Sequence, residues 1–153
     1  ALLLTALACL ILGMEVPTTA AYVICVSVAG PALTSLGLEP LLAHLFVFWY
    51  ALLSTITPPV CGGVFIAAGM VGENWLKVAF KAMALGIGLY IIPLAMVANP
   101  EMIQLAFNPS GALLYALKVA IGLGAISYGV IARKALWQRS ALAVGGIILI
   151  FVV

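Results

Sequence analysis

The segment "GMEVPTTAAY", residues 13–22, interrupts an apolar stretch and decides how the N-terminal region can fold. It places a glutamate, a proline and two threonines between two hydrophobic runs. Residues 1–12 before it span only about 18 Å as a helix, and residues 18–33 after it form a second short arm, whereas a bilayer core is about 30 Å thick. We therefore predict a re-entrant helical hairpin over residues 1–34, with its tip within residues 13–18.

Composition indicates the surroundings of this hairpin. Of the 153 residues, 67% are hydrophobic and 7% are charged, and the mean hydropathy is +1.35. Soluble domains carry about 25% charged residues, so this composition predicts an all-α integral membrane protein whose surface contacts the lipid bilayer. The net charge of +2 is too small and too localised to indicate nucleic-acid binding.

A second interruption, "STITPPVCGG" at residues 54–63, divides the apolar segment of residues 40–70. Pro58 and Pro59 each remove an amide donor and clash with the preceding turn, and the glycine pair after them allows backbone angles closed to other residues. We expect a discontinuous transmembrane helix, with free carbonyls on one half and free amides on the other. Such groups are costly in hydrocarbon unless they line a buried or aqueous site.

The rest of the chain is expected to add simpler crossings. Residues 76–98 are predicted to form one crossing, and residues 99–153 a surface connection followed by extra transmembrane helices. Ala125 and Gly129 are four residues apart, a spacing of small residues that permits close helix packing. Because the sequence starts and stops within apolar runs, we expect it to be part of a longer polypeptide.

The distribution of basic residues predicts the orientation. Basic side chains gather at residues 133–139, between the last two crossings, so this segment is expected in the cytoplasm. Residues 100–110, which contain no Lys or Arg, are then outside, and both ends of the hairpin lie on the outer side. The same count is compatible with two full crossings over residues 1–33. Lys118 fits neither side and is expected to snorkel or to face the bundle interior.

The two interruptions together indicate a binding site. Both are expected at mid-depth in the membrane, where secondary transporters use discontinuous helices to bind substrates and Na⁺. Helix N-termini attract anionic groups, and freed carbonyls with threonine hydroxyls suit a hard cation. Neither interruption supplies a cluster of carboxylates, so a calcium or magnesium cage is not expected.

These segments resemble a known family. "GMEVPTTAAYVI", followed by "LGLEPLLAHLFVFWYALLSTITPPVCGGVFIAAG", is similar to the large membrane subunit of tripartite ATP-independent periplasmic (TRAP) transporters, and most of all to fused TAXI-type permeases. The resemblance covers roughly residues 10–100, and its two motifs are specific in this order. From about residue 111 onward, the chain resembles the family only in the extra helices that its fused members carry. Cys61 stands where glycine is commoner, and Glu15 precedes the proline.

The resemblance implies a function and partners. Residues 1–98 would be the second of two inverted repeats in the transport domain of an elevator-type transporter, and the remaining half of the permease would supply the first. The family implies Na⁺-driven uptake of an organic acid delivered by a periplasmic binding protein, across the inner membrane of a bacterial or archaeal cell. It implies no enzymatic activity and no cofactor beyond Na⁺ as the coupling ion.

Site residues carry over from the two motifs. The residues expected to face the substrate or ion come from the hairpin tip and from the broken helix: Gly13, Pro17, Thr18, Thr19, Thr55, Thr57, Pro58, Pro59 and Gly62. Thr18 and Thr57 would be the Na⁺ ligands.

Several alternatives stay open. The threonines could instead bond back to helix carbonyls, Glu15 could cap the second hairpin arm, and His44 is expected to be packed or interfacial. The cysteines are expected to be buried, reduced thiols. A membrane-embedded enzyme would need a nucleophile with a base, paired carboxylates or a metal set, yet the chain has no Asp and one His. A channel or assembly subunit, with the broken helix lining a pore, is the other alternative.

Overall fold

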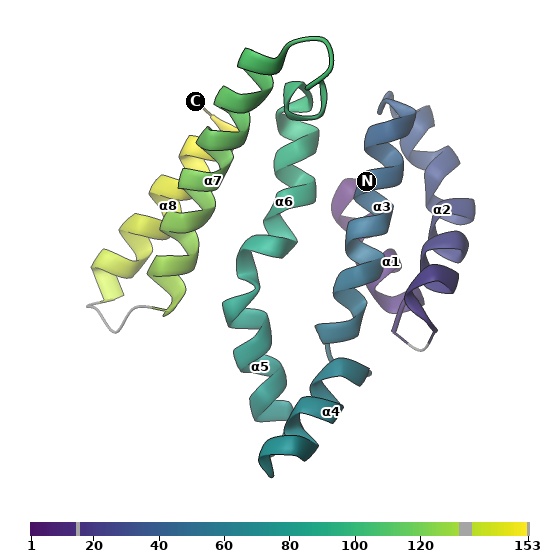
Figure 1. Ribbon diagram of the computed structural model, residues 1–153, viewed down its shortest axis with the longest axis vertical. Coiled ribbons are helices and arrows are strands. Elements are labelled where there is room, and N and C mark those ends of the chain that lie inside the picture. Colours follow the sequence, from purple (N-terminus) through teal and green to yellow (C-terminus); the bar gives the residue numbers. More distant parts are fainter. Residues whose placement is uncertain (15, 132–135, 153) are drawn as a thin grey trace. The chain divides into compact units, whose positions relative to one another are not determined.

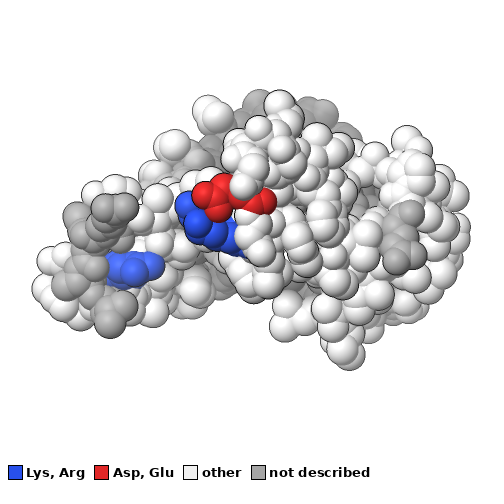
Figure 2. All heavy atoms as spheres, turned by 90° about the horizontal axis from the view of Figure 1, so that it is seen from below, with Lys and Arg blue, Asp and Glu red and all other residues white. Residues whose placement is uncertain are grey.

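A computed structural model describes residues 1–14, 16–131 and 136–152 of the chain. Over these residues the protein is helical and contains no strand, so the predicted all-α class is confirmed (Figure 1). The chain forms two compact units, Ala1–Met83 and Ala84–Val153. On the face shown in Figure 2, the charged side chains of the described residues form small groups, as expected for a protein in lipid.

The first unit begins with two helices joined by the interruption. Helix α1 spans Leu2–Leu12 and α2 spans Thr18–Ser35, so no continuous helix passes through Pro17. The two helices pack on each other and on α3 (Pro40–Leu53). The predicted interruption is therefore confirmed, whereas its re-entrant course in a membrane stays a prediction.

Helix α2 is longer than the arm predicted from the sequence. It continues to Ser35, where the Ser35 hydroxyl donates to Ala32 O, and Gly37 with φ of +90° then ends it. With 18 residues, α2 is long and apolar enough to cross a membrane, as is Pro109–Ile131 in the second unit. Trp75–Leu85 and Ile87–Ala98 would make a third span if they cross as one bent pair.

The broken helix is present with one correction. Helix α3 continues as the 3₁₀ turn η1 (Ser54–Ile56), residues 57–61 are not helical, and α4 spans Gly62–Val71. Thr57 is extended, as a residue before proline prefers. The expectation that the glycine pair supplies unusual backbone angles is wrong, because Gly62 and Gly63 lie in the first turn of α4 and neither has a positive φ. The two prolines alone end the helix.

Helix α5 (Trp75–Leu85) packs against the end of the break and the start of α4. Cys61, Val64 and Ala79 form a buried cluster, against which Trp75 also packs. Apolar contacts thus cover one side of the break.

The second unit contains α6 (Ile87–Ala98), the 3₁₀ turn η2 (Pro100–Ile103), α7 (Pro109–Ile131) and α8 (Leu136–Phe151). Its core includes four buried residues, Ala95, Val119, Ile126 and Ile150. The predicted close packing is observed, because an ideal Cβ on Gly129 would lie 2.9 Å from Arg139 O of α8. By packing, α6 belongs to this unit. The division predicted between residues 1–98 and 99–153 concerns function and stays a prediction.

Polar side chains join the helices of the second unit. Lys118 Nζ donates to Asn99 Oδ1 at 2.9 Å, and Asn99 Nδ2 donates to Ala95 O and Ile150 O. Lys118 therefore faces its neighbouring helices, one of the two positions expected for it. Arg133 and Lys134, on which part of the orientation argument depends, lie outside the described residues, as does Glu15.

Candidate functional site

The hairpin tip and the broken helix touch at Gly13. An ideal Cβ on this glycine would lie 2.6 Å from Ser54 Oγ and 2.9 Å from Ser54 Cβ, so only glycine fits there. Ser54 is fully buried, and its hydroxyl donates to Ala51 O at 2.6 Å. The two interruptions, about 40 residues apart in sequence, therefore meet in one compact unit.

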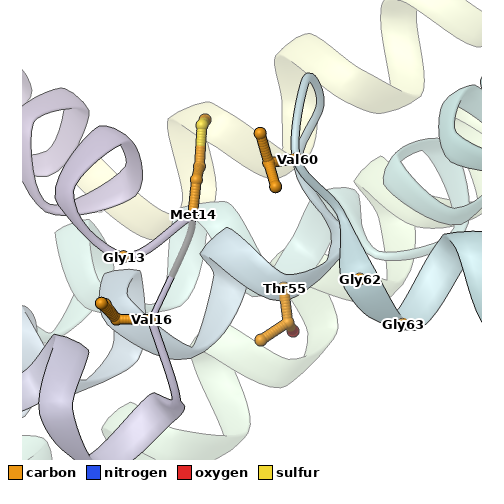
Figure 3. A pocket seen from close by; sticks show the side chains of 7 residues that line it. All are labelled: Gly13, Met14, Val16, Thr55, Val60, Gly62 and Gly63. Carbon is orange, nitrogen blue, oxygen red and sulfur yellow. The ribbon is translucent and has the colours of Figure 1, made fainter.

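A pocket of about 510 Å³ opens where they meet (Figure 3). The tip contributes three residues and the break contributes four: Gly13, Met14, Val16, Thr55, Val60, Gly62 and Gly63. Three of these residues are glycines, and only Thr55 has a hydroxyl group. Much of the polar lining therefore comes from the backbone. Sequence reasoning did not select Met14, Val16, Val60 or Gly63; their only signal was adjacency to the two motifs.

The predicted site residues divide into two groups. Gly13, Thr55 and Gly62 line the pocket. The other six lie next to it in the chain but do not line it. Thr18, Thr57 and Pro58 are half-buried, whereas Pro17, Thr19 and Pro59 are exposed.

Two threonine hydroxyls of the break bond to the preceding helix. Thr55 Oγ1 donates to Leu52 O at 2.8 Å, and Thr57 Oγ1 donates to Leu53 O at 2.6 Å. This is the back-bonding alternative left open by the sequence. In Thr55 it uses the hydroxyl proton and leaves the oxygen lone pairs, so it does not prevent that oxygen from binding a cation.

The first residues of α4, Gly62 and Gly63, line the pocket. Val64 N and Phe65 N both donate to Cys61 O, so the amides of Gly62 and Gly63 precede the first bonds of this helix. An ideal Cβ on Gly62 would meet no atom of the described residues within 4 Å. These amides therefore have no side chain of their own to cover them, and the helix N-terminus attracts negative charge.

The carbonyl end of η1 lies beside these amides. Thr55 O is 3.6 Å from an ideal Cβ on Gly63. Amides at the start of one helix and carbonyls at the end of another thus border the same pocket, and they suit an anionic group and a hard cation respectively. No group of three or more His, Cys, Asp or Glu in the described parts of the chain could hold a metal ion.

His44 and the cysteines do not line the pocket. His44 Nδ1 and Tyr22 Oη are 2.8 Å apart, which joins α3 to α2 on an exposed side of these helices. The predicted burial of Cys9, Cys25 and Cys61 is confirmed.

Comparison with known proteins adds one match. The model of the family described as "Tripartite ATP-independent periplasmic transporter, DctM component" matches residues 1–110. The matched range contains both interruptions and every residue of the pocket. Searches of curated proteins and of solved structures found no match.

Proposed function

This chain belongs to the DctM family of tripartite ATP-independent periplasmic transporter components, and on that premise we propose that it takes part in Na⁺-coupled uptake of an organic acid. The family works as a secondary transporter with a periplasmic binding protein. We propose that such a protein delivers the acid here, and that uptake occurs across the inner membrane of a bacterial or archaeal cell.

The single observation that supports a site for this activity is the pocket at the two interruptions. A carboxylate of the substrate would accept hydrogen bonds from the amides of Gly62 and Gly63, which precede the hydrogen bonds of α4. Na⁺ would bind oxygen atoms at the other border of the pocket, where the carbonyl and hydroxyl of Thr55 lie. The bound cation would offset the negative charge of the acid in a low-dielectric region.

We propose that the hairpin and the broken helix move together with the bound acid, as one of two inverted repeats in an elevator-type transporter. The contact of Gly13 with Ser54 supports a shared movement, because it joins the two elements through buried atoms. Helices α7 and α8 would be the extra helices of a fused TAXI-type permease, and the remaining half of the permease would complete the site.

The test compares two glycines of the same helix. An added methyl group would meet no described atom within 4 Å at either Gly62 or Gly69. Gly62 lines this pocket and Gly69 does not, so Gly62→Ala is the test and Gly69→Ala is the control. The full-length permease is reconstituted in proteoliposomes with its binding protein and an inward Na⁺ gradient, and uptake of a panel of small carboxylates is measured.

We expect Gly62→Ala to raise the KM for the transported acid about fivefold, since one hydrogen bond contributes about 1 kcal/mol. Gly69→Ala should leave the KM unchanged. Equal uptake under Na⁺ and K⁺ gradients would exclude Na⁺ coupling, and uptake of none of the carboxylates would exclude the organic acid. An unchanged KM in Gly62→Ala would remove this pocket as the site.

A further inference from the structure

Two thiols meet between the arms of the hairpin, apart from the pocket described above. Cys9 of α1 is 1% exposed and Cys25 of α2 is fully buried. Cys25 Sγ donates to Cys9 O at 3.7 Å, so the thiol of α2 lies against the residue of α1 that carries the other thiol. Tyr50 of α3 is also buried, and α3 packs on both α1 and α2. Three helices thus enclose a pair of sulfur atoms.

We propose that Cys9 and Cys25 form a two-thiolate site for Hg²⁺, which would bridge the two arms of the hairpin. Each thiol releases one proton and forms one S–Hg bond, so two protons leave and the ion binds without any change of oxidation state. Thiolates are the soft ligands that such an ion prefers.

Coordination number and charge select this ion among thiophilic metals. Zn²⁺ takes four ligands in structural sites, and the described residues hold no group of three or more His, Cys, Asp or Glu. Cu⁺ or Ag⁺ between two thiolates would leave one uncompensated negative charge, which is costly among apolar helices. Hg²⁺ with two thiolates is neutral overall, and its two-coordinate preference matches the two sulfur atoms.

Occupancy of this site would affect the hairpin tip. Cys9 O accepts a hydrogen bond from Gly13 N at 3.1 Å, so the thiol pair lies one helical turn from the contact with Ser54. A bridge between the arms fixes the end of α1 that carries the tip. Inhibition of uptake by Hg²⁺ would follow from this, and that step rests on the proposed function.

The binding test does not depend on transport. Purified, reduced full-length protein is loaded with HgCl₂, washed with an excess of a monothiol, and its retained mercury is measured per chain. A two-thiol chelate resists a monothiol far better than a single S–Hg bond does. We expect the parent protein and Cys61→Ser to retain one more Hg²⁺ than Cys9→Ser or Cys25→Ser. Cys61 is the matched control, because it is equally buried in the same unit.

Equal retention in all four proteins would overturn the proposal, and so would loss of retention in Cys61→Ser. If a serine variant fails to fold, the alanine variants are used. In the parent protein, mercury must also protect Cys9 and Cys25 from alkylation after denaturation, and full alkylation of both would overturn the site. Retained mercury without inhibited uptake would leave the site intact and exclude only its effect on the tip.

Discussion

At the scale of single residues, Gly13 and Ser54 determine how closely the hairpin tip approaches the broken helix. Gly13 has ordinary helical backbone angles, with φ of −83°, so its role is the absence of a side chain and not conformational freedom. Ser54 cannot retreat easily, because it is fully buried and bonded to Ala51 O. Neither sequence motif indicates this contact, because it depends on how the hairpin and the broken helix pack.

Gly13→Ala should therefore destabilise the protein. Overpacking a close contact costs about 1–3 kcal/mol, so we expect a lower melting temperature in detergent and reduced uptake. Gly69→Ala, with no described atom within 4 Å, is the control and should change neither. Adding Ser54→Gly to Gly13→Ala should restore part of the loss, because it removes both atoms of the clash. Strict additivity of the two substitutions would contradict this contact.

Thr57 provides a separate test of cation binding. It lies in the break between α3 and α4, and its hydroxyl donates to Leu53 O at 2.6 Å. We expect Thr57→Ala in the full-length permease to raise the Na⁺ concentration needed for half-maximal uptake about tenfold, which corresponds to about 1.4 kcal/mol. Thr57→Ser, which keeps the hydroxyl, should stay near the parent value.

Uptake is measured in proteoliposomes against Na⁺ concentration, with binding protein present. Thr18→Ala is examined in the same way. If neither alanine variant alters the Na⁺ curve, both threonines only bond back to their helices.

At the scale of elements, short polar interruptions fix how the helices associate. The hairpin and the broken helix each place an interruption between apolar helices. The two elements meet where Gly13 packs on Ser54. In the second unit, glycines allow the backbones of α7 and α8 to pack so closely that a Cβ atom would not fit between them. Small residues at such an interface replace the hydrophobic driving force that lipid does not provide.

Two adjacent glycines of α8 test this packing. An ideal Cβ on Gly146 would lie 2.5 Å from Gly122 O, a backbone atom, whereas one on Gly145 would meet nothing within 4 Å among the described residues. Gly146→Ala should force the helices apart and cost about 1–3 kcal/mol, and Gly145→Ala should be neutral or slightly stabilising because alanine favours helix. Thermal unfolding in detergent distinguishes them. Equal melting temperatures would contradict the close approach.

At the scale of the whole molecule, the two compact units carry different kinds of contacts. The first unit brings together the two interruptions and the thiol pair. The second unit contains a polar network in which Asn99 contacts α8 and the Lys118 ammonium. The family match covers all of the first unit and ends shortly after α7 begins. The pocket therefore lies wholly within the shared part of the family.

Orientation in the membrane is a prediction for the whole chain. In a background without other reactive cysteines, Phe107→Cys should react with an impermeant thiol reagent from outside intact cells, because Phe107 is 90% exposed in the predicted outer segment. Trp137→Cys, where the native residue is 71% exposed, should react only after permeabilisation. Labelling with the opposite pattern would reverse the predicted orientation.

The sequence by itself determined the all-α class, the family and the location of both interruptions. Composition indicated that the protein lies in lipid. Prolines, which lack an amide donor, indicated where helices are interrupted, as Pro17 and the Pro58–Pro59 pair illustrate. These are local effects of residue chemistry, so they can be inferred without knowledge of the packing.

Only the tertiary structure decided which of these residues meet. It brought Gly13 onto Ser54, placed Gly62 and Gly63 inside α4, and excluded Thr18 and Pro59 from the pocket lining. The apolar residues Met14 and Val60 line the pocket for the same reason. Contacts between segments about 40 residues apart depend on how helices pack, and a short polar motif does not specify which of its side chains face the partner.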